Sequence, residues 1–333
     1  MKIAIVGATG LVGQKMLEIL PEHKIAVDTI IAAASPRSAG RQVTYDGHQL
    51  TVLNVEQCLA QRPHIALFSA GGEVSKAWAE RFVEAGTFVI DNSSAWRMHA
   101  DVPLVVPEIN AHTINPKTRI IANPNCSTIQ LVMALAPLHA HFRIRRVVVS
   151  TYQSVTGSGL KGMQQLTDEE KEIDTTEKAY LHPIHRNVLP HGGAFDESGY
   201  TTEEQKLVDE TRKILEDDQM QITATVVRVP VMGGHSEAVN VEFFNDFDLA
   251  EVRRILEQMP GVVVQDNPAE AIYPMPLLAE GKDEVFVGRI RRDFSQPKTL
   301  NIWVVSDNVR KGAATNAVQI AGWLIEQGLV KNV

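Results

Sequence analysis

Cysteine is scarce in this sequence of 333 residues, which contains only Cys58 and Cys126. Two cysteines cannot build a disulfide framework, and these two lie too far apart for the Cys-x-x-Cys spacing of a metal site. Free thiols without disulfides are typical of a reducing compartment. The sequence therefore excludes a disulfide-stabilised secreted scaffold and leaves open what each thiol does.

Basic residues are also in the minority. The chain has 32 Lys and Arg against 40 Asp and Glu, which gives a formal net charge of -8. General electrostatic binding to nucleic acid or to an anionic membrane needs an excess of cations, and the sequence has no basic aromatic patch. We therefore expect no nucleic-acid partner and no membrane partner. Any anion must be bound by a few individually placed cations.

No hydrophobic run reaches the roughly 18 residues that a membrane-spanning helix needs. The chain passes from Met1 and Lys2 directly into the strand-like run Ile3–Val6, which leaves no room for a signal peptide. The sequence also lacks internal repeats and low-complexity linkers. We expect a soluble, cytoplasmic protein.

The composition that remains is that of an ordinary globular protein, with 44% hydrophobic and 22% charged residues. At this length about two domains are expected. In roughly the first 125 residues, β-rich runs alternate with helical patterns such as Val12–Leu20 and Val74–Glu84, which is typical of a parallel α/β sheet. The predicted strands are Ile3–Val6, Val27–Ala33, Ile65–Phe68, Phe88–Ile90 and Ile120–Ala122.

From about residue 143, longer strand candidates are separated by polar or helical insertions, which indicates an α+β domain with a mixed or antiparallel sheet. These candidates are Arg145–Tyr152, Gln221–Val229, Val239–Phe244 and Leu300–Val305, and Ala313–Gln327 has helical spacing. We predict an α/β, Rossmann-like domain made of residues 1–127 and 308–333. Residues 128–307 are predicted to form the second, α+β domain.

A glycine-rich turn follows the first predicted strand. Gly7, Gly10 and Gly13 stand directly after Ile3–Val6 and open a helical pattern, which is the context that a dinucleotide-binding turn requires. Gly7 can form the tight turn, Gly10 lets the backbone approach a pyrophosphate, and Gly13 permits close packing of helix and strand. A tight turn without a ligand is the alternative interpretation of the same residues.

The second predicted strand ends without the acidic residue that would bind the ribose 2′-hydroxyl of NAD. Instead, Arg37 follows shortly, with Ser35 and Ser38 near it. A guanidinium group and hydroxyls suit a 2′-phosphate, so this turn favours NADP over NAD. A solvated basic turn is the alternative.

Cys126 stands between the strand ending at Ala122 and the helical pattern Ile129–Leu138, so it is predicted to lie at or within the first turn of that helix. Unpaired N–H groups and the positive end of the helix dipole stabilise a thiolate there, which would make Cys126 a nucleophile. Cys58 lacks such a setting and is predicted to be a small packing residue. On these residues alone, a structural role for Cys126 stays open.

A thiolate enzyme needs a group that moves protons, and His235 is the candidate. It follows a pair of glycines, which predicts an imidazole on a glycine loop. Arg228, at the end of the preceding predicted strand, could pair with a carboxylate. Three further histidines lie in a proline-containing loop without metal-ligand spacing, so no metal site is predicted. They are His182, His185 and His191.

Six motifs occur together and in order along the chain. They are Gly7–Gly13, Asp91–Arg97, Asn123–Cys126, Tyr152–Gly159, Arg228–Val231 and Gly234–Ser236. With them the sequence resembles the bacterial-type aspartate-semialdehyde dehydrogenases, of the semialdehyde dehydrogenase family, from residue 1 to the C-terminal helix. Each motif alone is weak, but their joint order is highly specific.

The resemblance implies catalytic roles for four residues. Cys126 corresponds to the nucleophile that forms an acyl thioester, and His235 corresponds to the acid/base. Gln153 corresponds to the residue that orients the bound acyl group, and Asn125 to one that positions the cysteine.

The resemblance also implies a substrate site and a cofactor site. Arg228 corresponds to the residue that binds the substrate α-carboxylate, and Arg97 to one that binds phosphate. Glu210 and Lys213 correspond to the pair that recognises the amine and the phosphate; at i and i+3 they would share one helix face, although from the residues alone they would be a solvated ion pair. The residues implied to hold NADP are Gly7, Thr9, Gly10, Leu11, Val12, Arg37, Ser38, Thr156, Gly157 and Asn308.

The implied reaction is the reversible, NADPH-dependent reductive dephosphorylation of L-aspartyl-4-phosphate to L-aspartate-4-semialdehyde and phosphate. It belongs to the biosynthesis of lysine, threonine, methionine and diaminopimelate, and the family implies a homodimer. The alternative is a related acyl-phosphate reductase such as N-acetyl-γ-glutamyl-phosphate reductase. Glyceraldehyde-3-phosphate dehydrogenase shares the Cys/His chemistry, but it typically uses NAD. A homologue that only binds nucleotide would lack Cys126 or His235, and both are present.

Overall fold

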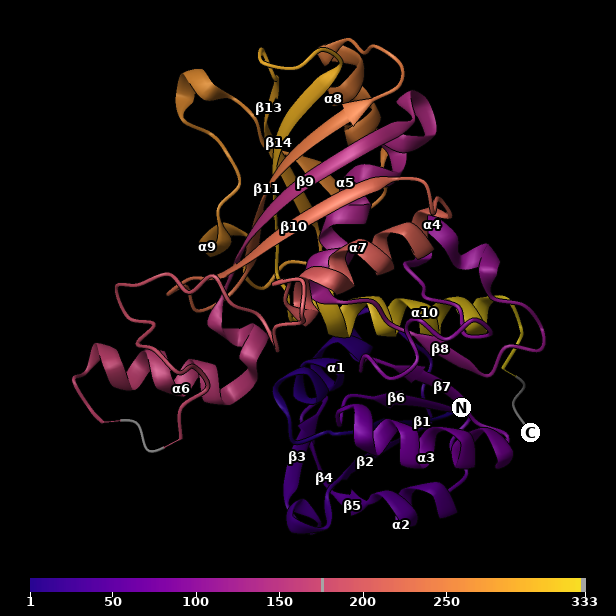
Figure 1. Ribbon diagram of the computed structural model, residues 1–333. Helices are drawn as coiled ribbons and strands as arrows, with labels where there is room; N and C mark the ends of the chain where they lie inside the picture. Colours follow the sequence, from indigo (N-terminus) through magenta and orange to yellow (C-terminus); the bar gives the residue numbers. More distant parts are fainter. Residues whose placement is uncertain (175–176, 331–333) are drawn as a thin grey trace. The chain divides into compact units, whose positions relative to one another are not determined.

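The computed structural model describes residues 1–174 and 177–330 (Figure 1). The chain divides into two compact units. The first comprises Met1–Asn125 together with the C-terminal segment from Ala313, and the second comprises Cys126–Gly312. Among the described residues, no helix combines the length and the apolar character needed to cross a membrane.

The first unit is built on a six-stranded parallel sheet. Its strands are β1 (Lys2–Val6), β2 (Thr29–Ala34), β5 (Leu53–Asn54), β6 (Ile65–Phe68), β7 (Phe88–Asp91) and β8 (Ile120–Ala122). They run in the order β5-β2-β1-β6-β7-β8, and every neighbouring pair is parallel. The predicted Rossmann-like parallel sheet is therefore confirmed. The sequence missed only β5, whose two residues are too few to form a recognisable pattern.

Helices cover both faces of this sheet. They are α1 (Leu11–Glu22), α2 (Val55–Ala60), α3 (Gly72–Glu84), the short α4 (Pro107–Asn110) and α10 (Thr315–Glu326); a hairpin of β3 (Gln42–Tyr45) and β4 (His48–Thr51) forms a separate small sheet. Ile3 and Ile5 pack with α1 and α10, whereas Ala4 and Val6 pack with α2 and α3. Alternate strand residues point to opposite faces, so β1 must be apolar throughout.

Cys58 lies in α2 within the second of these apolar layers. Its side chain is completely buried beside Val55, Ala79 and Phe82. Burial raises the pKa of the Cys58 thiol to about 12. The thiol is therefore protonated and inaccessible at neutral pH, as suits a packing residue.

The second unit is built on a mixed six-stranded sheet. Its strands are β9 (Ile144–Gln153), β10 (Gln221–Arg228), β11 (His235–Phe243), β12 (Val262–Val264), β13 (Val285–Arg292) and β14 (Thr299–Ser306), in the order β10-β9-β11-β14-β13-β12. The pairs β10–β9 and β12–β13 are parallel and the other three are antiparallel. This confirms the predicted α+β domain, although β12 and β13 were not predicted.

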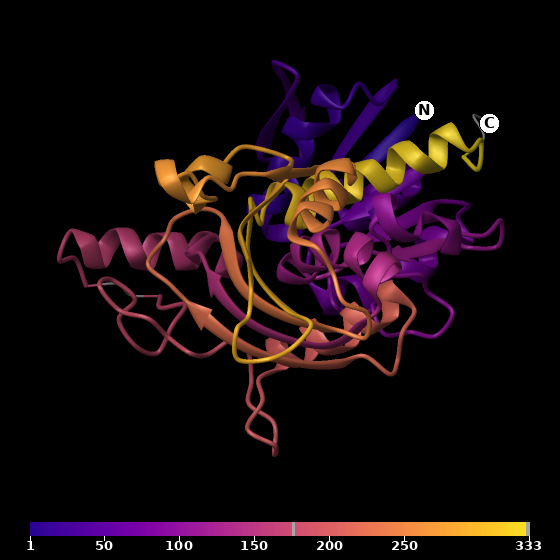
Figure 2. The ribbon, with the colours of Figure 1, turned by 90° about the horizontal axis from the view of Figure 1, so that it is seen from above.

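Helix α5 (Cys126–Phe142) packs at the centre of the second unit. The other helices of this unit are α6 (Gly159–Glu170), α7 (Thr202–Leu215), α8 (Leu249–Gln258) and the short α9 (Pro276–Ala279). Helix α5 packs on one face of the sheet, with α7 and α8 beside it, and nearly all of its first ten residues are buried. Figure 2 shows the strands curving along their length, with α6 standing away from the sheet.

Candidate active site

Cys126 is the first residue of α5. The chain leaves β8 at Ala122, turns through Asn123, Pro124 and Asn125, and enters the helix at the cysteine. The Cys126 side chain is only partly buried. Backbone N–H groups in the first turn have no partner within the helix, and together with the helix dipole they favour a thiolate. The structure thus puts Cys126 in the setting that the sequence predicts for a nucleophile.

Gly312 packs directly against Cys126. A Cβ atom added at Gly312 would lie 2.9 Å from the Cβ of Cys126 and 3.3 Å from its Cα. Gly312 belongs to the π-helical turn Arg310–Ala314, and such turns are frequent at functional sites. Only a glycine allows the backbone to approach the start of α5 this closely.

Gln153 anchors the start of α5 to the sheet. Its side-chain Nε2 donates a hydrogen bond of 2.7 Å to the hydroxyl of Ser127, the residue after Cys126. The Gln153 side chain is fully buried, and its Oε1 has no hydrogen-bond partner among the described residues. One end of this amide therefore fixes the helix, and the other can meet a further donor.

Arg228, Gln153 and His235 form a row across three strands. Arg228 ends β10 and pairs in register with Gln153, which ends β9. His235 begins β11, one position before Ser236, which pairs with Tyr152 of β9. Residues side by side on adjacent strands point to the same face of a sheet, so the three side chains share the face that carries α5.

The structure corrects the predicted position of His235. The sequence predicts a glycine loop there, with the next strand starting later, at Val239. In the structure the loop ends at Gly234, which has a φ of +78°, and His235 already belongs to β11. The strand extends further because β14 pairs with it as far as Ser306 opposite His235. The imidazole is thus held by the sheet rather than by a mobile loop.

The His235 imidazole is completely buried and is bonded through one nitrogen. Its Nδ1 lies 3.1 Å from the backbone N–H of Ser154 and 3.0 Å from the Ser154 hydroxyl. The pKa of His235 lies well below its ordinary value because the ring is buried and because the positive charge of Arg228 is close. A neutral imidazole is therefore expected at physiological pH.

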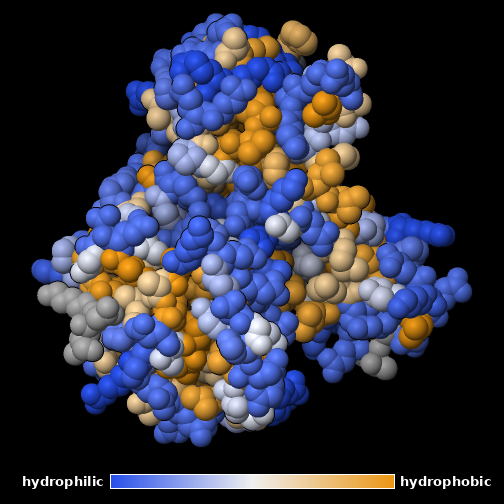
Figure 3. Space-filling model, turned by 180° about the vertical axis from the view of Figure 1, so that it is seen from behind, coloured by the Kyte–Doolittle hydropathy of each residue, from blue (hydrophilic) through white to orange (hydrophobic). Residues whose placement is uncertain are grey.

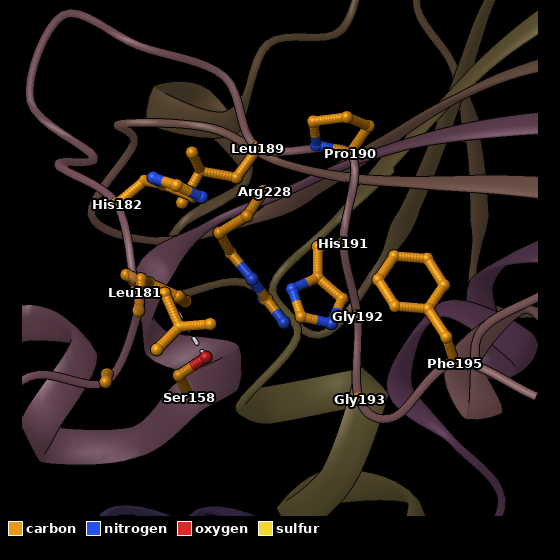
Figure 4. A pocket seen from close by; sticks show the side chains of 12 residues that line it. Ser158, Leu181, His182, Leu189, Pro190, His191, Gly192, Gly193, Phe195 and Arg228 are labelled. Carbon is orange, nitrogen blue, oxygen red and sulfur yellow. Dashed lines mark hydrogen bonds between the residues drawn. The ribbon is translucent and has the colours of Figure 1, made fainter.

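Arg228 reaches from the row into a cavity of about 430 Å³. One of its terminal nitrogens donates to the carbonyl oxygen of Ser154 at 2.8 Å, and its guanidinium carbon lies 6.0 Å from the centre of the Tyr180 ring. Figure 4 shows the Arg228 side chain extending toward the middle of this cavity, beside the ring of His191. Its Nε is buried and has no partner among the described residues. The cavity therefore offers a fixed cation to an anionic group.

Two of the three histidines for which no metal site was predicted lie at this cavity. His182 and His191 line the cavity, and the His191 ring stacks on Phe195 with ring centres 4.6 Å apart. In the part of the chain that the structure describes, no three His, Cys, Asp or Glu side chains come together as metal ligands would.

Glu210 and Lys213 lie on α7, which begins with a capping box formed by Thr201 and Glu204. Glu210 is buried and Lys213 is partly buried. Burial lowers the pKa of the Lys213 ammonium, and the nearby carboxylate of Glu210 offsets part of this effect. The pair is therefore more enclosed than the solvated ion pair that the sequence alone would suggest.

Asn308 is held in one orientation by three donors. Its Oδ1 accepts hydrogen bonds from the hydroxyls of Ser154 and Thr156, at 3.0 and 3.1 Å, and from the backbone N–H of Gly234, at 3.2 Å. Because the oxygen is occupied, the amide nitrogen is the end that a ligand can meet. Sequence reasoning assigned no role to Ser154, the residue that joins Asn308, Arg228 and His235.

In the first unit, the glycine turn has the geometry that a dinucleotide needs. Gly7 has a φ of +100°, and a Cβ there would lie 2.3 Å from the carbonyl oxygen of Ser69; a Cβ at Gly13 would lie 2.2 Å from the carbonyl oxygen of Gly7. Gly10 immediately precedes α1. The turn therefore brings strand and helix together so closely that only glycine fits, and it leaves the helix N-terminus open to phosphate. Of the other residues predicted to hold NADP here, Thr9 lies in this turn, and Leu11 and Val12 are the first two residues of α1.

Beyond the second strand, Arg37 lies in a short 3-10 turn, Pro36–Ser38. Its side chain is exposed and has no ion-pair partner among the residues that the structure describes. A cavity of about 310 Å³ adjoins this turn and has mainly apolar walls. It is lined by Ala34, Ser35, Pro36, Asn54, Val55, Glu56, Ala70, Val74 and Trp78.

Arg97 is fixed by backbone carbonyls in the first unit. Its Nε donates to the carbonyl of Asn123 and a terminal nitrogen donates to that of Asn92, both at 2.9 Å. The side chain of Asn123 bonds to Asn92 at 2.5 Å and to Asn316 at 2.7 Å. Sequence reasoning missed Asn316, although an asparagine inside the apolar pattern Ala313–Gln327 is a signal for such a buried contact.

Two family models match most of the chain. "Semialdehyde dehydrogenase, NAD binding domain" matches residues 2–116, and "Semialdehyde dehydrogenase, dimerisation domain" matches residues 135–311. The chain is 51% identical over 339 residues to the aspartate-semialdehyde dehydrogenase of Aquifex aeolicus (strain VF5), covering 99% of both proteins.

Two solved structures resemble this one over nearly the whole chain. Aspartate semialdehyde dehydrogenase II from Vibrio cholerae, complexed with ASA, has a TM-score of 0.93 and 45% sequence identity, with 98% of each chain covered. Aspartate semialdehyde dehydrogenase with NADP from Candida albicans has a TM-score of 0.77 and 26% identity, with 99% of each chain covered.

Proposed function

Because this chain belongs to the semialdehyde dehydrogenase family, we propose that it is an NADP-dependent aspartate-semialdehyde dehydrogenase. It converts L-aspartyl-4-phosphate into L-aspartate-4-semialdehyde and phosphate, and it catalyses the reverse reaction. The observation that carries this proposal is the row of Arg228, Gln153 and His235, which Gln153 ties to the start of the Cys126 helix. The names of the relatives support the same substrate.

The first chemical step belongs to Cys126. Its thiolate attacks the acyl carbon of the aspartyl phosphate, the bond between that carbon and the phosphate oxygen breaks, and a thioester remains on the sulfur. Arg228 binds the α-carboxylate, Glu210 the amine, and Lys213 and Arg97 the departing phosphate. The free Oε1 and the fixed amide of Gln153 orient the acyl group beside the cysteine.

His235 manages the proton in the second half of the reaction. NADPH, when bound, supplies the hydride that reduces the acyl group, and a neutral thioester accepts it more readily than a carboxylate. His235 then protonates the resulting oxyanion, and it takes the proton back when the carbon–sulfur bond breaks and the aldehyde leaves.

Residues of both units suit NADP. In the first, Gly7, Gly10 and Gly13 leave backbone space for the pyrophosphate, the apolar cavity beside Trp78 suits an adenine ring, and Arg37 suits the 2′-phosphate. In the second, Asn308 presents its amide nitrogen beside Thr156, and Gly157 follows. The relative solved with NADP supports the same cofactor. We therefore assign the pyrophosphate and the 2′-phosphate of NADP to residues of the first unit, and catalysis, with the remaining NADP contacts, to the second.

A homodimer formed through the second unit completes the proposal. The family model that covers residues 135–311 is described as a dimerisation domain. Apolar side chains reach the surface at several places on the face shown in Figure 3. A second copy could cover some of the exposed apolar side chains of the second unit. The most exposed large ones are Leu160, Leu181, Val188, Phe195, Leu277 and Phe294.

The function is tested by phosphate-dependent NADPH formation. The purified protein is assayed with L-aspartate semialdehyde and with N-acetylglutamate semialdehyde, each with NADP or NAD. We expect turnover with the aspartate substrate and a higher kcat/KM for NADP. A preference for the acetylated substrate would instead assign N-acetyl-γ-glutamyl-phosphate reductase, and a preference for NAD would contradict the role of Arg37.

Gly157→Ala is expected to lower kcat/KM for L-aspartate semialdehyde about 10- to 100-fold. A Cβ at Gly157 would lie 2.5 Å from the Arg228 guanidinium and 3.1 Å from the His235 ring, so both groups would be displaced. No positive φ at Gly157 opposes alanine, so the free energy of unfolding should fall only through these close contacts, by about 1–3 kcal/mol. Gly72→Ala is the matched control, because its nearest neighbour lies 4.0 Å away. Equal activity of the two variants would contradict this packing.

A further inference from the structure

The hydrogen bonds around His235 determine which of its nitrogens carries the proton. The backbone N–H of Ser154 points at Nδ1 from 3.1 Å, and a backbone N–H can only donate. Nδ1 of the neutral ring is therefore an acceptor, and the proton resides on Nε2. Nε2 itself has no hydrogen-bond partner among the described residues and lies against Gly157. It is the nitrogen available to a substrate.

This tautomer creates a problem for proton transfer. A neutral imidazole that gives up its Nε2 proton becomes an unstable imidazolate unless Nδ1 gains a proton at the same time. Water does not reach Nδ1, because the ring has no exposed surface and the backbone N–H and the hydroxyl of Ser154 both lie against that nitrogen. Arg228 retains its protons throughout, and the buried acid Glu237, two residues along β11, forms no hydrogen bond with the imidazole. The proton for Nδ1 must come from elsewhere.

Two hydroxyl groups connect Nδ1 toward the surface. The Ser154 hydroxyl lies 3.0 Å from Nδ1, and the Thr156 hydroxyl lies 2.8 Å from that of Ser154. Ser154 is completely buried, whereas Thr156 is partly exposed. The Oδ1 of Asn308 accepts from both hydroxyls, which holds their oxygens in place. Each hydroxyl has only one proton, so for transfer the Ser154 proton turns from Asn308 toward Nδ1 and the Thr156 proton turns toward Ser154.

We propose that Ser154 and Thr156 form a proton relay between solvent and Nδ1 of His235. When Nε2 donates its proton to the substrate oxyanion, Ser154 donates its hydroxyl proton to Nδ1, Thr156 reprotonates Ser154, and water reprotonates Thr156. His235 is then neutral with its proton on Nδ1. When Nε2 takes the proton back from the substrate hydroxyl, the same transfers run in reverse, so no charge accumulates on the buried ring.

The relay serves the reaction proposed above and depends on it. The relay also gives Thr156 a role in proton transfer, in addition to the NADP binding that the family resemblance implies. Ser154 is the cleaner position for a test, because Ser154→Ala removes the hydroxyl and keeps the backbone N–H that orients His235.

The test compares Ser154→Ala, Thr156→Val and Thr156→Ser with the parent protein. In semialdehyde oxidation we expect Ser154→Ala and Thr156→Val to lower kcat about 10- to 100-fold, while KM for the semialdehyde changes less than about threefold. We also measure kcat in mixtures of H2O and D2O and plot it against the deuterium fraction. The plot should be curved for the parent and for Thr156→Ser, which keeps the hydroxyl, because several protons move together. It should be a straight line for Ser154→Ala and Thr156→Val, in which a single proton moves. If Ser154→Ala fails to fold, the two Thr156 variants decide.

A merely structural role for Ser154 would lower kcat and leave the curved dependence unchanged, and this outcome would overturn the relay. The tautomer is measured separately, by nitrogen-15 NMR of the His235 ring without substrate. A proton found on Nδ1 would overturn the relay whatever the activity. A parent protein inactive on both semialdehydes, with the proton on Nε2, would contradict the proposed substrate and with it the reaction that the relay serves.

Discussion

Cys126→Ser is expected to lose more than about a thousandfold in kcat/KM for L-aspartate semialdehyde. At the start of α5 a thiol can ionise near neutral pH, whereas a serine hydroxyl in the same place keeps its proton. The two side chains are nearly equal in size, and Cys126 is only partly buried. The variant should therefore melt at the parent temperature and bind NADP, so the loss appears in phosphate-dependent NADPH formation alone.

The other cysteine provides the matched control. Cys58→Ala should retain kcat, although its free energy of unfolding should fall by about 1 kcal/mol because a small buried group is lost. At pH 8 iodoacetamide should modify Cys126 and spare Cys58, whose pKa of about 12 and complete burial both prevent reaction. Mass spectrometry of the alkylated protein distinguishes the two sites. Substantial turnover of Cys126→Ser would rule out the thioester route.

Arg228→Lys is expected to raise KM for L-aspartate semialdehyde about 30- to 150-fold, the equivalent of about 2–3 kcal/mol for a charge-assisted pair. Arg228 can donate to the Ser154 carbonyl, at 2.8 Å, and still present further N–H groups to a carboxylate. A lysine ammonium is a single point charge and cannot reproduce this planar arrangement. Steady-state kinetics at varied semialdehyde concentration measures the effect.

Arg145→Lys is the control for this substitution, because Arg145 lies at the opposite end of β9, exposed and paired with Glu242 at 3.0 Å. Exposed ion pairs contribute little, so KM and kcat should stay within about twofold of the parent. If Arg228→Lys lowered kcat and left KM unchanged, Arg228 would orient Ser154 and His235 instead of binding the carboxylate.

The sequence predicted those features of the structure that depend only on residues close together in the chain. The apolar runs at β1, β6 and β7 are predicted because strands buried on both faces must be apolar throughout. Gly7 and Gly13 are predicted from their spacing between a strand and a helical pattern, and contacts of 2.3 and 2.2 Å in the structure leave no space for a side chain at either position. Cys126 was predicted at a helix start because a strand, a proline turn and an apolar helix follow each other within a few residues.

The sequence failed where a partner distant along the chain decides. Strand β5 and strands β12 and β13 are too short or too polar to be recognised alone, and they exist because neighbouring strands pair with them. His235 belongs to a strand because β14 extends the ladder to Ser306. No local pattern distinguishes Ser154 from other serines, since its partners Arg228, His235 and Asn308 come from three other segments.

The two kinds of sheet, the thiol at a helix start and the scarcity of cations could all be predicted, because each depends on composition or on neighbouring residues. What surrounds those groups depends on contacts between distant segments. Burial makes Cys58 unreactive, and sheet register brings Arg228, Gln153 and His235 into one row. Hydrogen bonds between distant segments fix the tautomer of a buried histidine, because burial and pairing arise only when separated parts of the chain meet.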